Sequence, residues 1–257
     1  MNATDLEFQN MNNGNIISSY IYAYFSGYSE ETLHLLERSF WWSHIIGILI
    51  FLNYLYYSKH LHIILAFPNT YYASLSSLGK LNNMKSVTNE VNIMMGKSSE
   101  SDVNDDINFG ASDVMDLSWL QLLNAYSCTE CGRCTNVCPA NITGKKLSPR
   151  KIMMDTRDRI EEVGNNINKN WKYVNDNKKL LGDYISEEEL WACTSCNACV
   201  EECPISINPL SIIMDMRRNL VMENSSAPSE LNNMMSNIEN NGAPWPYNQQ
   251  DRLNWNE

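Results

Sequence analysis

Residues 128–139, CTECGRCTNVCP, and residues 193–204, CTSCNACVEECP, repeat one cysteine spacing twice. In each run two residues separate the first three cysteines from one another, three residues precede the fourth, and proline follows it. The chain has eight cysteines, so the two runs contain all of them. Cysteines at such short and identical intervals are typical of thiolates that bind metal.

This spacing is the one that holds two [4Fe–4S] clusters in bacterial ferredoxins. The two-residue gaps let three sulfurs of a run converge on one cluster, whereas the fourth sulfur points away and ligates the cluster of the other run. The sequence therefore predicts two crossed ligand sets. They are Cys128, Cys131, Cys134 and Cys203 for the first cluster, and Cys193, Cys196, Cys199 and Cys138 for the second.

Two alternatives would use the same cysteines. Zinc sites would favour paired Cys-x2-Cys motifs or added histidines, and four disulfides would need an oxidising compartment and looser spacing. Both alternatives fit the complete, repeated pattern less well than two iron–sulfur clusters do. Free thiolates also favour a reducing compartment, which indicates the cytoplasm.

An apolar stretch runs from Phe40 to Phe67, and Lys59 is its only formal charge. Its 28 residues are enough to cross a bilayer as a helix, and aromatic residues cluster near its ends. The alternatives are a buried core helix, or two shorter elements that break near Ser58. Acidic residues precede the stretch and lysines follow it, so the positive-inside rule places the C-terminal side in the cytoplasm.

Composition divides the chain into four parts. We expect a membrane segment at 1–78, a polar linker at 79–115, a helical domain with two [4Fe–4S] clusters at 116–223, and a polar tail at 224–257. The predicted fold class is therefore mainly α, a transmembrane helix segment followed by an α-helical ferredoxin domain. The net charge of −11 argues against nucleic acid as a partner.

The cysteine domain is an internal repeat. PRKIMMDTR at 149–157 matches PLSIIMDMR at 209–217 in the spacing of its proline, aspartate and arginine. Ser148 and Asn208 precede these prolines as expected N-caps, so each segment should start a helix. We also expect a second helix at about 168–181. The equivalent arginines, Arg157 and Arg217, are interpreted as part of a solvated helix face or as caps.

All four histidines lie in or beside the apolar stretch, where histidine typically binds haem or relays protons. His44 and His62 are 18 residues apart. In one helix they would share a face and lie about 27 Å apart, whereas His60 would point about 160° away. The sequence thus predicts haem b ligation by His44 and His62. The alternative is that these histidines cap backbone groups or meet lipid headgroups.

Two known families resemble parts of this chain. WWSH at 41–44 and YSKHLH at 57–62 resemble the last haem-binding helix of the respiratory nitrate reductase gamma subunit. FGASDVMDLSW at 109–119, the two cysteine runs, and NNGAPWP at 240–246 resemble membrane-anchored iron–sulfur proteins related to heterodisulfide reductase. This resemblance implies a cytochrome b-like membrane domain joined to a two-cluster domain, and an N-terminally truncated chain. It also implies a separate CCG-type catalytic or flavin-containing subunit.

These observations predict an electron-transfer subunit of a membrane-bound oxidoreductase, located in the cytoplasmic membrane with its cysteine domain on the cytoplasmic side. It would pass electrons between quinone or haem b and a heterodisulfide-reductase-like partner. The alternative is a membrane-anchored two-cluster ferredoxin that docks to a partner without haem or quinone chemistry. No catalytic triad, phosphate-binding loop or carboxylate pair in the sequence indicates a substrate site of its own.

Overall fold

The structure, a computed structural model, describes residues 24–25, 27–97 and 109–256. The chain divides into two units, Met1–Leu61 and His62–Glu257. The described residues form helices and turns, and none of them belongs to a β-strand. The predicted mainly α fold is confirmed.

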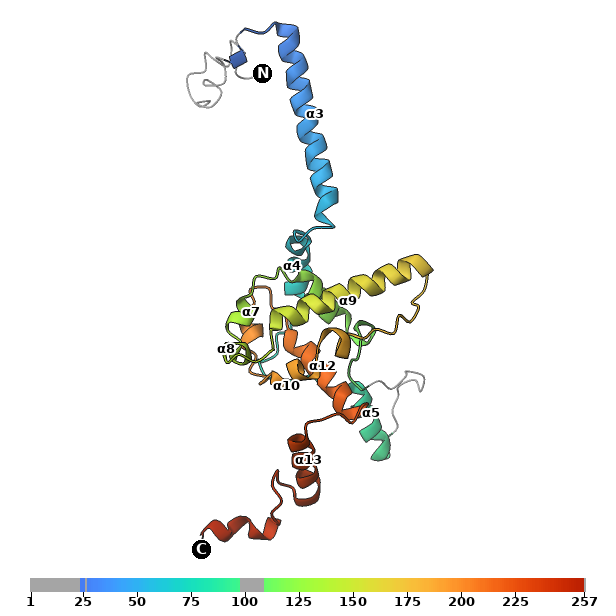
Figure 1. The fold of residues 1–257 in the computed structure, drawn as a ribbon, viewed down its shortest axis with the longest axis vertical. Coiled ribbons are helices and arrows are strands. Elements are labelled where there is room, and N and C mark those ends of the chain that lie inside the picture. The colour runs from blue at the N-terminus through green and yellow to red at the C-terminus, as the bar shows by residue number, and fades with distance from the viewer. Residues whose placement is uncertain (1–23, 26, 98–108, 257) are drawn as a thin grey trace. The chain divides into compact units, whose positions relative to one another are not determined.

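The first unit contains the long helix α3 (Glu30–Leu55) (Figure 1). Glu30 and Glu31 lie in its first turn, where negative charge favours a helix N-terminus. None of its residues is buried. Within the described part of the chain, α3 is the one helix long and apolar enough to cross a membrane.

The prediction of one helix from Phe40 to Phe67 is wrong. α3 ends at Leu55, and the next helix, α4, spans Leu61–Tyr71. The Ser58 hydroxyl donates to the Leu55 carbonyl (3.0 Å) and accepts from the His60 N–H (3.3 Å), so its side chain replaces helical backbone bonds. The alternative that the apolar stretch forms two shorter elements with a break near Ser58 is therefore confirmed.

Within the second unit, two similar halves surround the cysteine runs. Each half has a helix before its run, a short helix inside it and a longer helix after it, and Figure 1 labels the two longer helices, α9 and α12. In the first half these are α6 (Trp119–Ser127), α7 (Arg133–Asn136) and α9 (Pro149–Asn170). In the second half they are α10 (Glu187–Ala192), α11 (Ala198–Glu201) and α12 (Pro209–Met222).

Local sequence explains where these helices begin. α6 and α10 each start with a capping box, in which Ser118 pairs with Gln121 and Ser186 pairs with Glu189. α9 and α12 start at proline directly after the caps Ser148 and Asn208, as predicted. Their apolar faces form the centre of the core, with Ile152, Met153, Ile212, Ile213 and Met216 buried.

The remaining described elements lie between and after the two halves. They are α5 (Lys85–Met94), η1 (Val114–Asp116), α8 (Pro139–Ile142), η2 (Leu180–Tyr184), α13 (Ser229–Asn241) and η3 (Gln249–Asn256). α5 falls within the predicted linker and α13 within the predicted tail, so both ranges contain helix. The four domain boundaries stay predictions.

The helix predicted at about 168–181 is also wrong. α9 continues to Asn170, and Trp171 then adopts a left-handed backbone with φ 60°. The Asn166 side chain donates to the Val174 carbonyl (2.7 Å) and accepts from its N–H (3.2 Å). Because the Asn166 side chain bonds both the N–H and the carbonyl of Val174, the residues after α9 are held as a loop.

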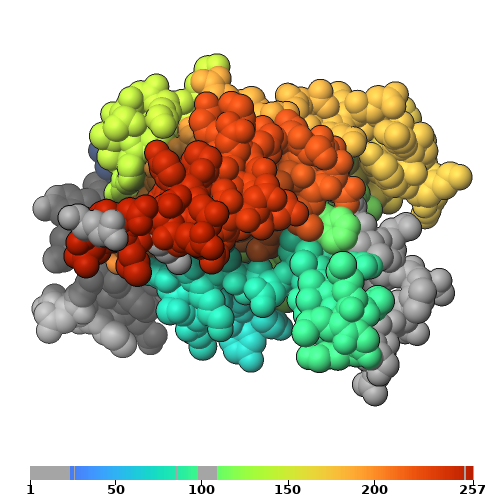
Figure 2. Space-filling view, turned by 90° about the horizontal axis from the view of Figure 1, so that it is seen from below, coloured from blue at the N-terminus to red at the C-terminus, as the bar shows by residue number. Residues whose placement is uncertain are grey.

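The segments before α6 pack against α12. The Ala111 N–H donates to the Asp215 carbonyl (3.0 Å), and Arg218 donates to the Asn82 carbonyl (2.6 Å). Figure 2 shows the green surface around α5 beside the orange surface of α12. Residues far apart in the sequence therefore support the helix that follows the second cysteine run.

Candidate metal centre

The two cysteine runs fold into loops with the same backbone. Glu130 and Ser195 occupy equivalent positions and have φ of 60° and 55°. Gly132 and Asn197 are likewise equivalent, with φ of 83° and 62°. Glycine and asparagine tolerate this left-handed conformation best, which explains their place in the runs. Both loops consequently turn in the same direction, and the Ser195 N–H donates to Sγ of Cys193 (3.4 Å).

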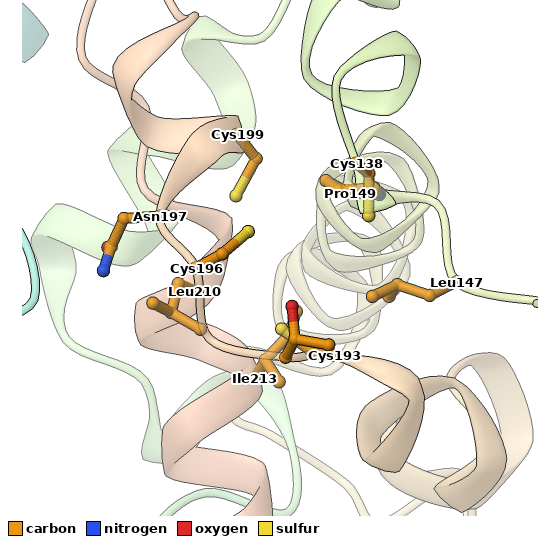
Figure 3. A pocket seen from close by; sticks show the side chains of 10 residues that line it. Cys138, Leu147, Pro149, Cys193, Cys196, Asn197, Cys199, Leu210 and Ile213 are labelled. Atoms are coloured by element: carbon orange, nitrogen blue, oxygen red, sulfur yellow. The ribbon is translucent and has the colours of Figure 1, made fainter. Parts of the chain in front are cut away.

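Four cysteines line the second cavity, shown in Figure 3. Three of them, Cys193, Cys196 and Cys199, come from the second run, and Cys138 comes from the first. The rest of the wall is mostly apolar and includes Leu147, Pro149, Leu210 and Ile213.

Another four cysteines line the first cavity in the complementary way. Cys128, Cys131 and Cys134 come from the first run, and Cys203 comes from the second. Cys199 touches this cavity as well, so the two cavities are neighbours. The structure thus brings together the two cysteine sets that the sequence predicts as ligands.

Burial makes these thiols weak acids in the metal-free chain. It raises the pKa of Cys134 to about 11 and that of Cys199 to about 12, and it also raises the pKa values of Cys128 and Cys193. Negative charge on Cys203 would raise the pKa of Cys128 and Cys134 further. A positively charged metal centre would reverse this repulsion and favour the thiolates.

The donor set fits a cluster of several irons better than a single metal ion. Four sulfurs bound to one zinc ion would lie about 3.8 Å apart, given a Zn–S distance of about 2.3 Å. Among the described residues, no three His, Cys, Asp or Glu side chains come close enough to hold one metal ion. Sulfurs spread around an apolar cavity suit a cluster, whose irons each take a separate thiolate.

Two arginines support the ligand loops, and sequence analysis missed this role. Arg157 on α9 pairs with Glu130 (2.7 Å), which lies between the first two cysteines of its run. Arg217 on α12 donates to the carbonyls of Leu190 and Cys193 and stacks on the Trp191 ring, 5.0 Å from its centroid. Their interpretation as a solvated face is wrong, because both are half-buried against the loops. The alternative that they act as caps is confirmed for Arg217, which donates to the Leu190 carbonyl in the last turn of α10. Their equivalent positions in the repeat were the available signal.

The histidines predicted to share one helix lie in different units. His44 is exposed on α3, whereas His62 belongs to α4 and lines the first cavity beside Arg133 and Arg150. His60 contacts Phe51, with 6.2 Å between ring centroids. The expected common face of His44 and His62 is therefore absent from the described helices, and haem ligation stays a prediction.

Comparison with known proteins agrees with this geometry. Residues 127–207 match the family model of the 4Fe-4S dicluster domain. The chain is 33% identical over 246 residues to the probable iron-sulfur-binding oxidoreductase FadF of Bacillus subtilis, covering 84% of this chain and 33% of that protein. It is 29% identical over 252 residues to EtfAB:quinone oxidoreductase of Syntrophomonas wolfei, covering 91% and 33%.

A third relative is the probable membrane-anchored ferredoxin of Chromohalobacter salexigens, 32% identical over 168 residues, or 58% of this chain and 24% of that protein. Heterodisulfide reductase subunits of Methanosarcina species match over shorter stretches, which confirms the resemblance to that group. The chain spans about a third of the length of the first two relatives. Residues 127–207 are a 4Fe–4S dicluster domain, on a chain whose relatives are iron–sulfur oxidoreductases, a membrane-anchored ferredoxin and heterodisulfide reductase subunits.

Proposed function

We propose that this chain is an electron-transfer subunit of a membrane-bound oxidoreductase, with a [4Fe–4S] cluster in each cavity. One observation carries the proposal: two neighbouring cavities are each lined by three cysteines of one run and one of the other. Clusters of this class accept and release single electrons when bound. Crossed ligand sets keep two such centres close together within one small domain.

The chain's own residues would hold and insulate these centres. Cys128, Cys131, Cys134 and Cys203 would bind in the first cavity, and Cys193, Cys196, Cys199 and Cys138 in the second. The peptide N–H groups of Glu130 and Ser195 donate to the sulfurs of Cys128 and Cys193, and such donors stabilise charge on sulfur. The apolar walls limit the access of water, which protects the iron–thiolate bonds and strengthens the electrostatic interactions of nearby charges with the cluster.

The proposed setting is the cytoplasmic membrane. α3 would anchor the chain, and the lysines that follow it favour a cytoplasmic position for the cysteine domain. Quinone is the proposed membrane partner, in line with the name of the EtfAB:quinone oxidoreductase relative. A separate catalytic or flavin-containing subunit would exchange electrons with the domain. Haem b ligation by His44 and His62 is the remaining part of this proposal.

Iron content of cysteine variants tests the crossed sets. The reconstituted chain should hold about eight iron and eight sulfide, and Cys128→Ala should leave about four of each. Adding Cys203→Ala to Cys128→Ala should cost no further iron, because both residues serve the first cavity. Adding Cys138→Ala instead should remove the rest. The reverse result would mean that each run holds its own cluster, and stoichiometric zinc would end the proposal.

A second function has one observation in its favour. His62 lines a cysteine cavity and does not share a helix with His44, which favours a membrane-anchored two-cluster ferredoxin without haem. Reduced-minus-oxidised spectra of membranes with the native complex discriminate the two functions. Cytochrome b bands that weaken in His44→Ala support haem and quinone chemistry. Broad iron–sulfur bleaching alone, unchanged in His44→Ala, supports the anchored ferredoxin.

A further inference from the structure

The residues that line the two cavities occupy equivalent positions of the internal repeat. The segment after each fourth cysteine supplies an apolar residue and a proline to the cavity of the other run. These are Leu147 and Pro149 in the second cavity, and Ile207 and Pro209 in the first. The helices α9 and α12 supply Met153 and Ile213 at equivalent positions. Most of the two walls is thus apolar in the same places.

Two lining positions of the first cavity break this correspondence. Arg133 and Arg150 line the first cavity. The equivalent residues of the second half are Ala198 and Leu210, and Leu210 lines the second cavity. A cation therefore replaces a small or apolar side chain at both positions.

These two arginines place positive charge beside the ligand loop, and no described carboxylate pairs with either of them. Nη1 of Arg150 lies 3.7 Å from where a Cβ on Gly132 would be, so its guanidinium reaches the loop between Cys131 and Cys134. Among the described residues, neither Arg133 nor Arg150 forms an ion pair with a carboxylate. Their positive charge at the first cavity is thus not neutralised locally.

The other charges near the loops reduce this asymmetry without removing it. Arg157 is balanced by Glu130, whereas among the described residues Arg217 has no carboxylate partner and puts one positive charge beside the second loop. Glu201 and Glu202 are exposed and lie between Cys199 and Cys203, which are ligands of different sites, so their charge does not favour one site over the other. The first site has two uncompensated cations in its wall, and the second has one beside its loop.

Reduction adds negative charge to an iron–sulfur site, and nearby cations stabilise the more negative form. We infer that Arg133 and Arg150 give the site of Cys128, Cys131, Cys134 and Cys203 a higher reduction potential than the site of Cys193, Cys196, Cys199 and Cys138. The first electron added to the chain then resides at the first site. This inference rests on the proposed function, because it requires a cluster in each cavity.

Redox titration of the full chain, followed by electron paramagnetic resonance, tests the order of potentials. The Cys138→Ala variant retains the first site and Cys203→Ala retains the second, so each midpoint can be assigned. Cys138→Ala should show the higher midpoint. Equal midpoints, or a higher one in Cys203→Ala, would overturn the inference.

Substitution to the residues of the other half tests the cause. At low ionic strength, Arg133→Ala or Arg150→Leu should lower the midpoint of the first site, and reduce its reduced-to-oxidised ratio at fixed potential roughly two- to threefold, because both side chains are exposed and water screens their charge. That equals about 20–30 mV for one electron. The second site should change little, and Ala198→Arg should raise its midpoint. Shifts of both sites together, or of neither, would contradict the assigned role.

Lys169→Ala is the matched control. Lys169 belongs to the same helix as Arg150 but lies about 28 Å further along it, so its removal should move neither midpoint. Iron and sulfide are measured on every sample. Absence of four-iron signals in the unmodified chain would contradict the proposed function. Two normal clusters whose reduction potentials have the opposite order would contradict this inference alone. If a cysteine variant loses both sites, Arg150→Leu in the unmodified chain must shift one of the two redox waves.

Discussion

Raised thiol pKa values give the metal-free chain a specific response to alkaline pH. An unfolded thiol has a pKa of about 8.5, whereas burial raises the pKa of Cys134 to about 11 and of Cys199 to about 12. The folded chain therefore holds these protons more tightly than the unfolded chain. Their contribution to stability is complete below about pH 8.5 and is lost as pH rises towards the folded values.

We expect the free energy of unfolding of the apoprotein to fall between about pH 8.5 and about pH 11, measured by urea denaturation at a series of pH values. Lysines and tyrosines titrate in the same range, so the control is the double variant Cys134→Ala, Cys199→Ala. Its unfolding free energy should depend less steeply on pH. Equal slopes in the two proteins would show that the thiols are not the cause.

Arg159 is the most buried charged residue among those described and should dominate stability near α9. Its side chain has no exposed surface, and it bonds Asp113 and Asp176. Arg159→Met should reduce the free energy of unfolding by about 3–5 kcal/mol, because the carboxylate of Asp113 loses its partner. Lys178→Ala removes an exposed ion pair with Glu162 and should cost under about 1 kcal/mol. Thermal denaturation of both variants measures the difference.

At the scale of residues, chemistry that depends on spacing could be predicted and chemistry that depends on packing could not. The cysteines carry their own signal, since their intervals suit one kind of centre. Arg157, Arg159 and Arg217 all lie on helices. The sequence alone does not show whether an arginine on a helix faces water or packs against a loop. Only the packing of α9 and α12 against the ligand loops separates these cases.

At the scale of elements, Gly110 tests how the segment before α6 is held against α12. Its φ is +86°, and a Cβ there would lie 2.2 Å from the Asp215 carbonyl oxygen. Gly110→Ala should therefore separate the segment from α12 and cost more than about 2 kcal/mol of unfolding free energy. A Cβ at Gly164 on α9 would meet no atom within 4 Å, so Gly164→Ala should instead stabilise the chain by about 0.5–1 kcal/mol. Urea denaturation of both variants measures the two changes, and effects of the same sign would contradict this account.

Helix starts were easier to predict than helix ends. Caps and prolines are local, so Ser148 and Asn208 identify the beginnings of α9 and α12 from sequence. The end of α3 near Leu55 is not visible in composition, because apolar residues continue on both sides of Ser58. The loop after α9 likewise depends on the Asn166 side chain, which bonds a residue eight positions later.

At the scale of the whole molecule, the two units should be separable in function. α3 buries none of its residues within the protein, so polar substitutions there should not disturb the cysteine domain. Two arginines in the C-terminal half of the helix, Ile48→Arg with Leu52→Arg, should oppose insertion by up to about 2.5–3.5 kcal/mol each, the cost at a membrane centre. If α3 anchors the chain, this variant should leave the membrane fraction and keep about eight iron per chain.

The measurement is fractionation of membranes washed with alkaline carbonate, together with iron content of the soluble protein. Ile63→Arg and Ile64→Arg on α4 provide a comparison outside α3, because they add the same charge at exposed apolar positions. These α4 substitutions should leave the chain in the membrane. Release by the α4 variant as well would mean that α4 contributes to membrane binding. Retention of the α3 variant would exclude α3 as the anchor, whereas release with loss of iron would mean that the clusters depend on the membrane unit.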